Sequence, residues 1–79
     1  MYKDLDEQVS VTVIFERGEI RPLRFYWKDR SSQVSRVTGR WKAPQGDTWK
    51  RHFSVVDTAD HVFHLTYEER NIRWAISKV

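Results

Sequence analysis

Residues 49–67 read Trp-Lys-Arg-His-Phe-Ser-Val-Val-Asp-Thr-Ala-Asp-His-Val-Phe-His-Leu-Thr-Tyr, and they carry the clearest structural signal in the chain. Apolar and polar side chains alternate on both sides of the central Thr-Ala-Asp, which is typical of two β-strands that each bury one face. If these three residues form a turn, antiparallel pairing places Val55 opposite Phe63 and Phe53 opposite Leu65. A shift of one residue would turn every apolar side chain to the wrong face. The stretch therefore predicts a β-hairpin with a defined register.

The same period of two recurs before and after this hairpin, so we expect strands along most of the chain. Gly18 lies in a short turn between the first two runs, where it can adopt the positive φ of a tight hairpin. No segment has the spacing of an amphipathic helix. The predicted strands are residues 9–15, 20–27, 32–42, 49–56, 61–67 and 71–77.

Three features interrupt this regular pattern. Pro22 has no N–H to give to a ladder and therefore marks an edge position or a bulge. Val34 and Val37 cannot share a face at a period of two, which predicts a bulge near Ser35. Residues 43–48 have the composition of a loop, and we expect them to separate the two halves of the chain.

Six short strands joined by short turns describe an all-β antiparallel meander. A flat sheet of this size would leave one face and two edges open, so we expect it to curl into a small barrel or a strongly bent sheet. The 79 residues form a single domain, in which residues 1–8 are expected to be a flexible N-terminal arm. The expected inward-facing residues are Val9, Val11, Val13, Leu23, Phe25, Trp27, Val37, Trp41, Phe53, Val55, Phe63, Leu65, Ile72, Trp74 and Ile76.

The composition excludes several classes of protein. Without cysteine the chain has no disulfide framework, no thiolate zinc site and no thiol nucleophile. The first residues lack the apolar core of a secretory signal, and no run approaches the roughly 18–20 apolar residues that cross a membrane. We therefore expect a cytoplasmic protein. Its net charge of +3 is modest, so the placement of the charges is more informative than their sum.

Acidic and basic residues are segregated along the chain. No Asp or Glu lies inside the predicted strands, whereas eight Arg and Lys residues do. We expect a sheet with a positive body and negative rims, which would attract an anion. Sheet surfaces that bind single-stranded nucleic acid combine such cations with aromatic side chains for stacking. The candidate nucleic-acid-binding residues are Arg24, Tyr26, Lys28, Arg36, Arg40 and Lys50, all expected to face outward or to lie at the edge of that face.

Other interpretations of these residues stay open. Arg and Lys on an outer face can simply cover apolar surface with their stems and keep their charged ends in water. The chain could also be a protein-interaction accessory domain that docks through an edge strand or through Trp49. Trp49 begins its strand beside Lys50 and Arg51, and Trp and Arg are enriched at the centres of protein interfaces. Alternatively, the Trp49 indole only closes the end of the barrel.

The histidines and serines give little support to catalysis or metal binding. His61 and His64 are three residues apart, so on a strand they point to opposite faces. His52 and His64 could share a face across the hairpin, but two ligands alone make a poor metal site. Ser54 opposite His64 suggests a nucleophile and a base, without an orienting acid in the same strands. We therefore expect no enzymatic activity, no metal and no cofactor.

The chain resembles a family of short bacterial proteins that have no assigned activity. The most specific segment is Arg-Pro-Leu-Arg-Phe-x-Trp at residues 21–27. The chain departs from the family pattern at Asp29, where a Gly is usual, and at Gln33, where an aromatic is usual, which leaves the type of the second turn open. The resemblance implies an all-β cytoplasmic protein. The segments that carry it are residues 15–27, 36–41, 52–56 and 73–74.

The leading interpretation is a non-enzymatic small β-barrel binding module that holds nucleic acid on a basic sheet face. It depends on the absence of acidic residues from every predicted strand. The alternative is the protein-interaction accessory domain described above.

Overall fold

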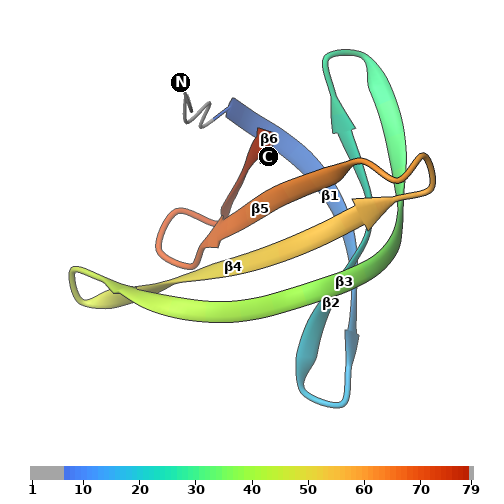
Figure 1. The fold of residues 1–79 in the computed structure, drawn as a ribbon. Helices are drawn as coiled ribbons and strands as arrows, with labels where there is room; N and C mark the ends of the chain where they lie inside the picture. The colour runs from blue at the N-terminus through green and yellow to red at the C-terminus, as the bar shows by residue number, and fades with distance from the viewer. Residues whose placement is uncertain (1–6, 79) are drawn as a thin grey trace.

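The computed structural model describes residues 7–78, and over these residues the chain is a closed antiparallel β-barrel (Figure 1). Its strands are β1 (Glu7–Glu16), β2 (Glu19–Trp27), β3 (Arg30–Gln45), β4 (Thr48–Asp57), β5 (Val62–Glu68) and β6 (Arg73–Lys78). Consecutive strands pair with each other, and β1 closes the barrel by pairing with β6. The predicted all-β class and six-stranded meander are confirmed, and the sheet is a closed barrel. Of the predicted N-terminal arm, residues 1–6 lie outside the described residues, and β1 already begins at Glu7.

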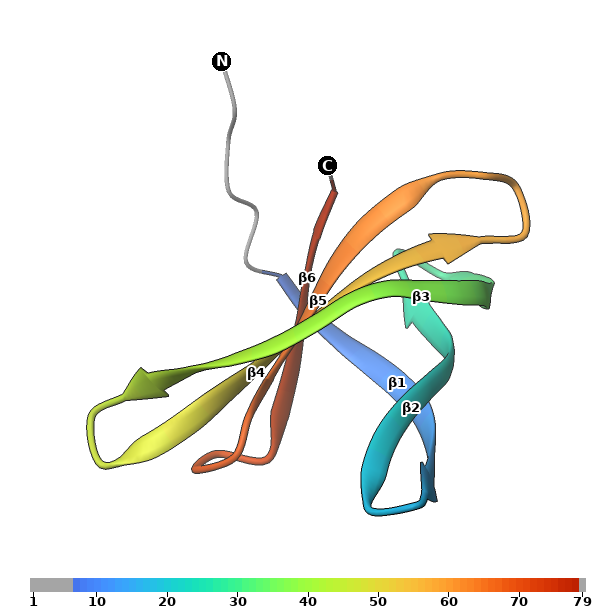
Figure 2. The same cartoon turned by 60° about the horizontal axis from the view of Figure 1, so that its bottom comes forward.

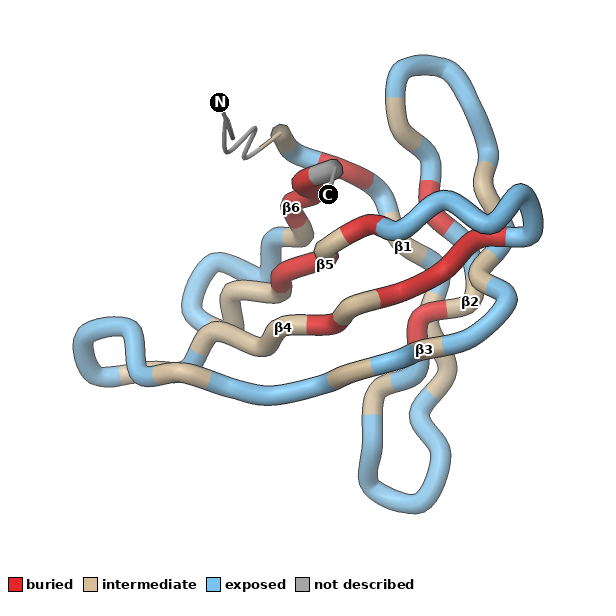
Figure 3. The backbone as a smooth tube through the Cα atoms, viewed as in Figure 1, coloured by how far each residue is buried: buried red, intermediate tan, exposed pale blue. Residues whose placement is uncertain are grey.

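The core of the barrel is centred on β4, β5 and β6. The register predicted for β4 and β5 is confirmed, because Val55 pairs with Phe63 and Phe53 pairs with Leu65. All four side chains are buried, and Figure 3 shows buried segments in each of these strands. Phe25 of β2 packs edge-on against Phe63, with ring centroids 5.1 Å apart. Each such side chain stabilises the fold by about 1.5–3 kcal/mol, because its apolar surface is removed from water.

The pairing between β2 and β3 is short. It joins residues 24–27 of β2 to residues 30–33 of β3. Beyond these residues β3 follows β4 in a long hairpin, while β1 and β2 form a separate hairpin. Figures 1 and 2 show the two hairpins leaving the barrel in different directions. The first part of β2 and most of β3 are therefore not paired with each other.

Two irregularities in β3 determine which of its side chains face outward. The predicted bulge near Ser35 is confirmed by a register shift at this position. A second shift, between Val37 and Gly39, leaves Thr38 without a partner in β4. The Thr38 hydroxyl donates instead to the backbone oxygen of Ser54 at 3.2 Å. An extra residue in one strand reverses the facing of all residues that follow it.

The second bulge makes two of the predicted side-chain directions wrong. Trp41, predicted to face inward, pairs with His52 and is 50% exposed. Arg40, predicted to face outward, pairs with Phe53, whose side chain belongs to the core. Cross-strand partners share a face of the sheet. The bulge has therefore turned Trp41 to the outer face and Arg40 to the face that carries Phe53, the reverse of the sequence prediction, although the Arg40 side chain remains exposed.

An irregularity of β2 lies where Pro22 predicted it. The register between β1 and β2 shifts so that Leu23 has no partner in β1. Pro22 is fully buried and Leu23, predicted to face inward, is only half-buried. Because proline has no N–H, β2 offers no backbone donor at this position.

Three turns refine or correct the sequence predictions. The predicted loop 43–48 is reduced to a tight turn with Gly46 at a φ of 64°, because its first three residues continue β3. Lys28 and Asp29 form the β2–β3 turn with φ values of 52° and 60°, which are typical of a type I′ turn. Ile72, predicted to face inward, lies in the β5–β6 turn with a φ of 50° and is 78% exposed.

Asp57 organises the turn between β4 and β5. Its Oδ1 accepts hydrogen bonds from the backbone N–H of Ala59 at 2.9 Å and of His61 at 2.8 Å. The backbone N–H of Thr58 donates to the Gln33 carbonyl at 3.1 Å, which ties this turn to β3. Burial alone would raise the pKa of Asp57, but the two N–H donors and the neighbouring His61 imidazole hold it below its ordinary value.

Asp57→Ala removes this acceptor and is expected to lower the free energy of unfolding at neutral pH by about 1–2 kcal/mol. Asp57→Asn is the matched control, because its amide oxygen still accepts while the charge is lost. The pKa of Asp57 in the folded protein lies below its ordinary value of 3.8. The stabilisation by its carboxylate is therefore complete above pH 3.8 and is lost as the pH falls through the pKa of the folded protein.

Urea unfolding of the three proteins at neutral pH and at about pH 3 measures both effects. Equal stability of Asp57→Ala and the wild type at neutral pH contradicts the role assigned to this side chain.

Candidate functional site

A cleft opens where β2 and β3 stop pairing. Two adjoining cavities of about 520 and 170 Å³ lie between the β1–β2 and β3–β4 hairpins, and both are lined by Glu19 and Arg40. Cationic side chains outnumber carboxylates in the lining, so the cleft is electropositive. We call it the arginine cleft; its cations are Arg17, Arg21, Arg36, Arg40, Lys42 and Arg51, and its carboxylates are Glu16 and Glu19.

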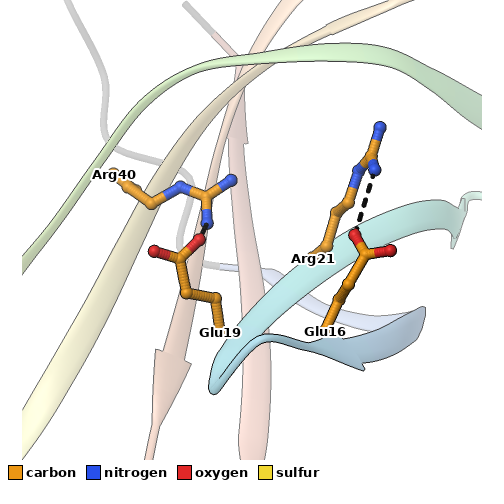
Figure 4. A network of polar contacts seen from close by, with 4 residues as sticks. All are labelled: Glu16, Glu19, Arg21 and Arg40. Atoms are coloured by element: carbon orange, nitrogen blue, oxygen red, sulfur yellow. Dashed lines mark hydrogen bonds and ion pairs between the residues drawn. The ribbon is translucent and has the colours of Figure 1, made fainter.

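Two ion pairs hold arginines of the cleft in place (Figure 4). Arg40 Nη1 of β3 lies 2.6 Å from Glu19 Oε2 of β2. This pair bridges the parts of the two strands that are not paired with each other. Arg21 Nη1 lies 3.4 Å from Glu16 Oε1 within the β1–β2 hairpin. All four side chains are exposed by more than a third, and water and salt screen such pairs to about 0–1 kcal/mol each. An anionic ligand can therefore replace either carboxylate at a small energetic cost.

Two further arginines of the cleft have no acidic partner among residues 7–78. Arg17 lies in the β1–β2 turn with a φ of 55°, and Arg36 follows the first bulge of β3. Both line the larger cavity, and neither forms an ion pair with a described carboxylate. Their guanidinium groups keep hydrogen-bond donors available for an incoming anion.

The side of the cleft nearest β4 carries cations with other partners. Arg51 Nε lies 2.6 Å from Glu69 Oε2. Lys42 Nζ lies 4.9 Å from the centroid of the Trp49 ring, which is a cation–π distance. Trp49, the predicted protein-contact residue, is 43% exposed near the tip of the β3–β4 hairpin. Trp49 lines neither cavity and is linked to the cleft through Lys42, and its contact with a partner stays a prediction.

The six residues predicted to bind nucleic acid do not form one surface. Arg36 and Arg40 line the arginine cleft. Arg24 and Tyr26 are exposed on the part of β2 that pairs with both neighbouring strands, and neither lines the cleft. The barrel has divided the predicted patch, and the cleft recruits other cations that are distant in sequence.

The strand and turn cations have several kinds of partner, and the ion pairs among these reduce the positive face expected from the sequence. Lys28 Nζ lies 4.9 Å from the Trp27 ring, and Lys50 pairs with Glu68 in the sheet register, as predicted for this hairpin. Acidic residues at the strand ends also reach back to cations inside the strands. These pairs join Arg21 to Glu16, Arg40 to Glu19, Arg51 to Glu69 and Arg73 to Glu68.

An aromatic cluster that the sequence analysis missed extends across β3, β4 and β5. The Trp41 ring stacks on His52 with centroids 5.2 Å apart and planes 4° apart, and it lies 5.4 Å from His64. The two imidazole rings lie 5.0 Å apart, with His52 Nδ1 at 2.9 Å from His64 Nε2, a hydrogen-bonding distance. A sequence signal for this cluster was Gly39, because an isolated glycine within a strand often marks a bulge.

The described residues offer no assembled metal site. Between residues 7 and 78 no group of three or more His, Cys, Asp or Glu side chains could hold an ion. Ser54 and His64 face each other in the register that the sequence predicted, and Ser54 Oγ lies 3.1 Å from Thr38 Oγ1.

The described part of the chain also contains no helix long and apolar enough to cross a membrane.

Comparison of the chain with models of protein families, with curated proteins and with solved structures finds no match. The resemblance to a family of short bacterial proteins therefore stays a prediction.

Glu19→Gln removes a carboxylate from the cleft and releases the Arg40 guanidinium. We expect the affinity for tripolyphosphate, a small polyanion, to rise about five-fold, because a charge repulsion of about 1 kcal/mol at 4 Å in water disappears. Isothermal titration calorimetry at low salt measures this affinity. Asp60→Asn makes the same charge change at an exposed turn outside the cleft, and should raise the affinity less. Equal gains in the two variants contradict a local role for Glu19.

Proposed function

We propose that the chain is a cytoplasmic, non-enzymatic β-barrel module that binds nucleic acid in the arginine cleft. The observation that carries the proposal is that arginines from two separate hairpins line the same cavity. Arg17 and Arg21 belong to the β1–β2 hairpin, and Arg36 and Arg40 belong to β3. A guanidinium group matches the geometry of a phosphate and can donate two parallel hydrogen bonds to it. Cations on both walls suit a ligand whose phosphates repeat along a chain.

The chemistry of the lining favours binding over catalysis. An arginine side chain stays protonated at neutral pH, so it neither accepts nor releases a proton in a reaction. Such a residue holds and orients an anion. The absence of cysteine agrees with a reducing compartment such as the cytoplasm, where disulfides are rare.

A strand of nucleic acid fits this cleft better than an isolated phosphate. The two cavities adjoin at Glu19 and Arg40, and cations line both of them. Proteins that bind single strands combine a positive groove along the backbone with aromatic rings that stack on the bases. Trp41 lines the smaller cavity and supplies such a ring.

Protein–protein interaction is the second candidate function, and one observation favours it. From residue 36 to residue 45, β3 pairs with β4 on one side and with no described strand on the other. An exposed strand edge can accept an extended peptide as an additional strand. The cations of the cleft would then select an acidic peptide.

The proposed function predicts that a double charge reversal, Arg36→Glu with Arg40→Glu, lowers the affinity for a single-stranded oligonucleotide by at least about ten-fold. The slope of log affinity against log salt should become less negative by about 1–1.5, because two phosphate contacts are lost. Fluorescence anisotropy over a salt series measures both quantities, and circular dichroism verifies the fold.

The matched control is Arg24→Glu with Arg30→Glu, which changes the net charge equally at exposed positions outside the cleft. It should weaken binding much less. An equal loss of affinity in both double variants would mean that the overall electric field of the protein attracts the oligonucleotide. That result contradicts binding in the cleft. A wild-type protein that binds an acidic peptide and no oligonucleotide would support the second candidate instead.

A further inference from the structure

Trp41 lies on β3 between two cations of the arginine cleft. Its neighbours in sequence, Arg40 and Lys42, alternate with it along β3 and line the arginine cleft. Half of the residue is exposed, although most large aromatic side chains of the barrel are buried or half-buried. The smaller cavity, of about 170 Å³, is lined by Trp41 together with Arg40, Lys42 and Arg51. Arg40 and Lys42 alternate with Trp41 and point to the opposite face of β3, so a ligand that touches both the indole and these cations lies across the unpaired edge of the strand.

Trp41 is held in a fixed orientation by its neighbours. His52 stacks almost parallel to the indole, with centroids 5.2 Å apart, and His64 lies 5.4 Å away. The two histidines are themselves within hydrogen-bonding distance, at 2.9 Å between Nδ1 of His52 and Nε2 of His64. A ring that is already ordered loses little conformational entropy when a ligand stacks on it.

Gly39 lies beneath the indole of Trp41. A Cβ atom at residue 39 would lie 3.6 Å from the six-membered ring of Trp41 and 3.8 Å from the Cβ of Ser54. Both are ordinary van der Waals distances, so the indole packs closely on the backbone of β3 at this position. The result is a flat aromatic surface next to the edge of β3, with its exposed part available to solvent.

We propose that Trp41 is the stacking platform of a nucleotide subsite, backed by His52 and His64, and that it makes the cleft selective for single strands. The inference rests on the proposed function. The cations of the smaller cavity bind the phosphate, and the base stacks on the exposed part of the indole. Bases in a duplex stack on one another and offer no free face, whereas those of a single strand do.

The experiment compares three ligands with equal numbers of phosphates per strand: an oligothymidylate, an abasic oligonucleotide and a duplex. Fluorescence anisotropy at fixed low salt measures their affinity for the wild type, Trp41→Ala, Trp41→Phe and Phe15→Ala. The wild type should bind the oligothymidylate about ten-fold more tightly than the abasic strand, because stacking on an aromatic ring contributes about that factor per base. Trp41→Ala should lose this preference and keep its affinity for the abasic strand.

The other two variants separate stacking from a structural effect. Trp41→Phe keeps an aromatic ring and should retain part of the preference. Phe15→Ala removes an aromatic side chain that is 77% exposed and lies outside the cleft lining. This variant should retain the full preference for the oligothymidylate. If Trp41→Ala fails to fold, Trp41→Phe still tests the inference, because a reduced preference supports stacking on Trp41, and a preference equal to that of the wild type contradicts it.

Failure of the subsite and failure of the proposed function give different results. Equal, salt-dependent affinity of the wild type for the abasic and thymidylate strands overturns the Trp41 subsite and leaves phosphate binding in the cleft intact. Equal or tighter binding of the duplex likewise overturns the selectivity for single strands. Binding of none of the three ligands overturns the proposed function, and the subsite with it.

Discussion

The early end of the β2–β3 ladder is the constraint on which the functional geometry of this barrel depends. The two strands pair at four positions, between residues 24–27 and 30–33. Pro22 and the unpaired Leu23 interrupt β2 just before that ladder, and β3 continues along β4 alone. In a continuous sheet the backbone edges of these strands would satisfy each other and their side chains would lie side by side. Here they diverge, and the space between them is lined by charged side chains that a ligand can reach.

The bulge at Thr38 gives β3 two chemically different faces beyond it. Arg40 turns toward the face that carries Phe53, and Trp41 turns toward the face that carries His52. Without the extra residue, the cation would point to the outer face and the indole would enter the core. Bulges add local twist and re-aim side chains, and they occur frequently next to binding sites. The single inserted residue therefore determines which side chains of β3 face the arginine cleft.

Local charge matters more for this protein than its net charge. The +3 total is small, and several strand cations are paired with acidic residues at the strand ends. The pairs within the cleft are exposed, so water and salt screen them strongly. Arg17 and Arg36 add charge without a described acidic partner. A cleft with cations on both walls focuses its field on an anion more effectively than the same charges spread over the surface.

Local sequence was enough to obtain the strands, most of the turns and the register of β4 with β5. These features follow from a period of two in apolar side chains and from turn residues such as Gly18, and both act over a few residues. Arg36 and Arg40 could be identified as candidates because they are cations in acid-free strands. Only the tertiary structure decided that they line one cavity with Arg17 and Arg21. The exposure of Trp41 was likewise decided by the tertiary structure. The physical reason is that a bulge reverses facing at a position that local alternation does not reveal, and that two diverging strands bring distant residues to one cleft.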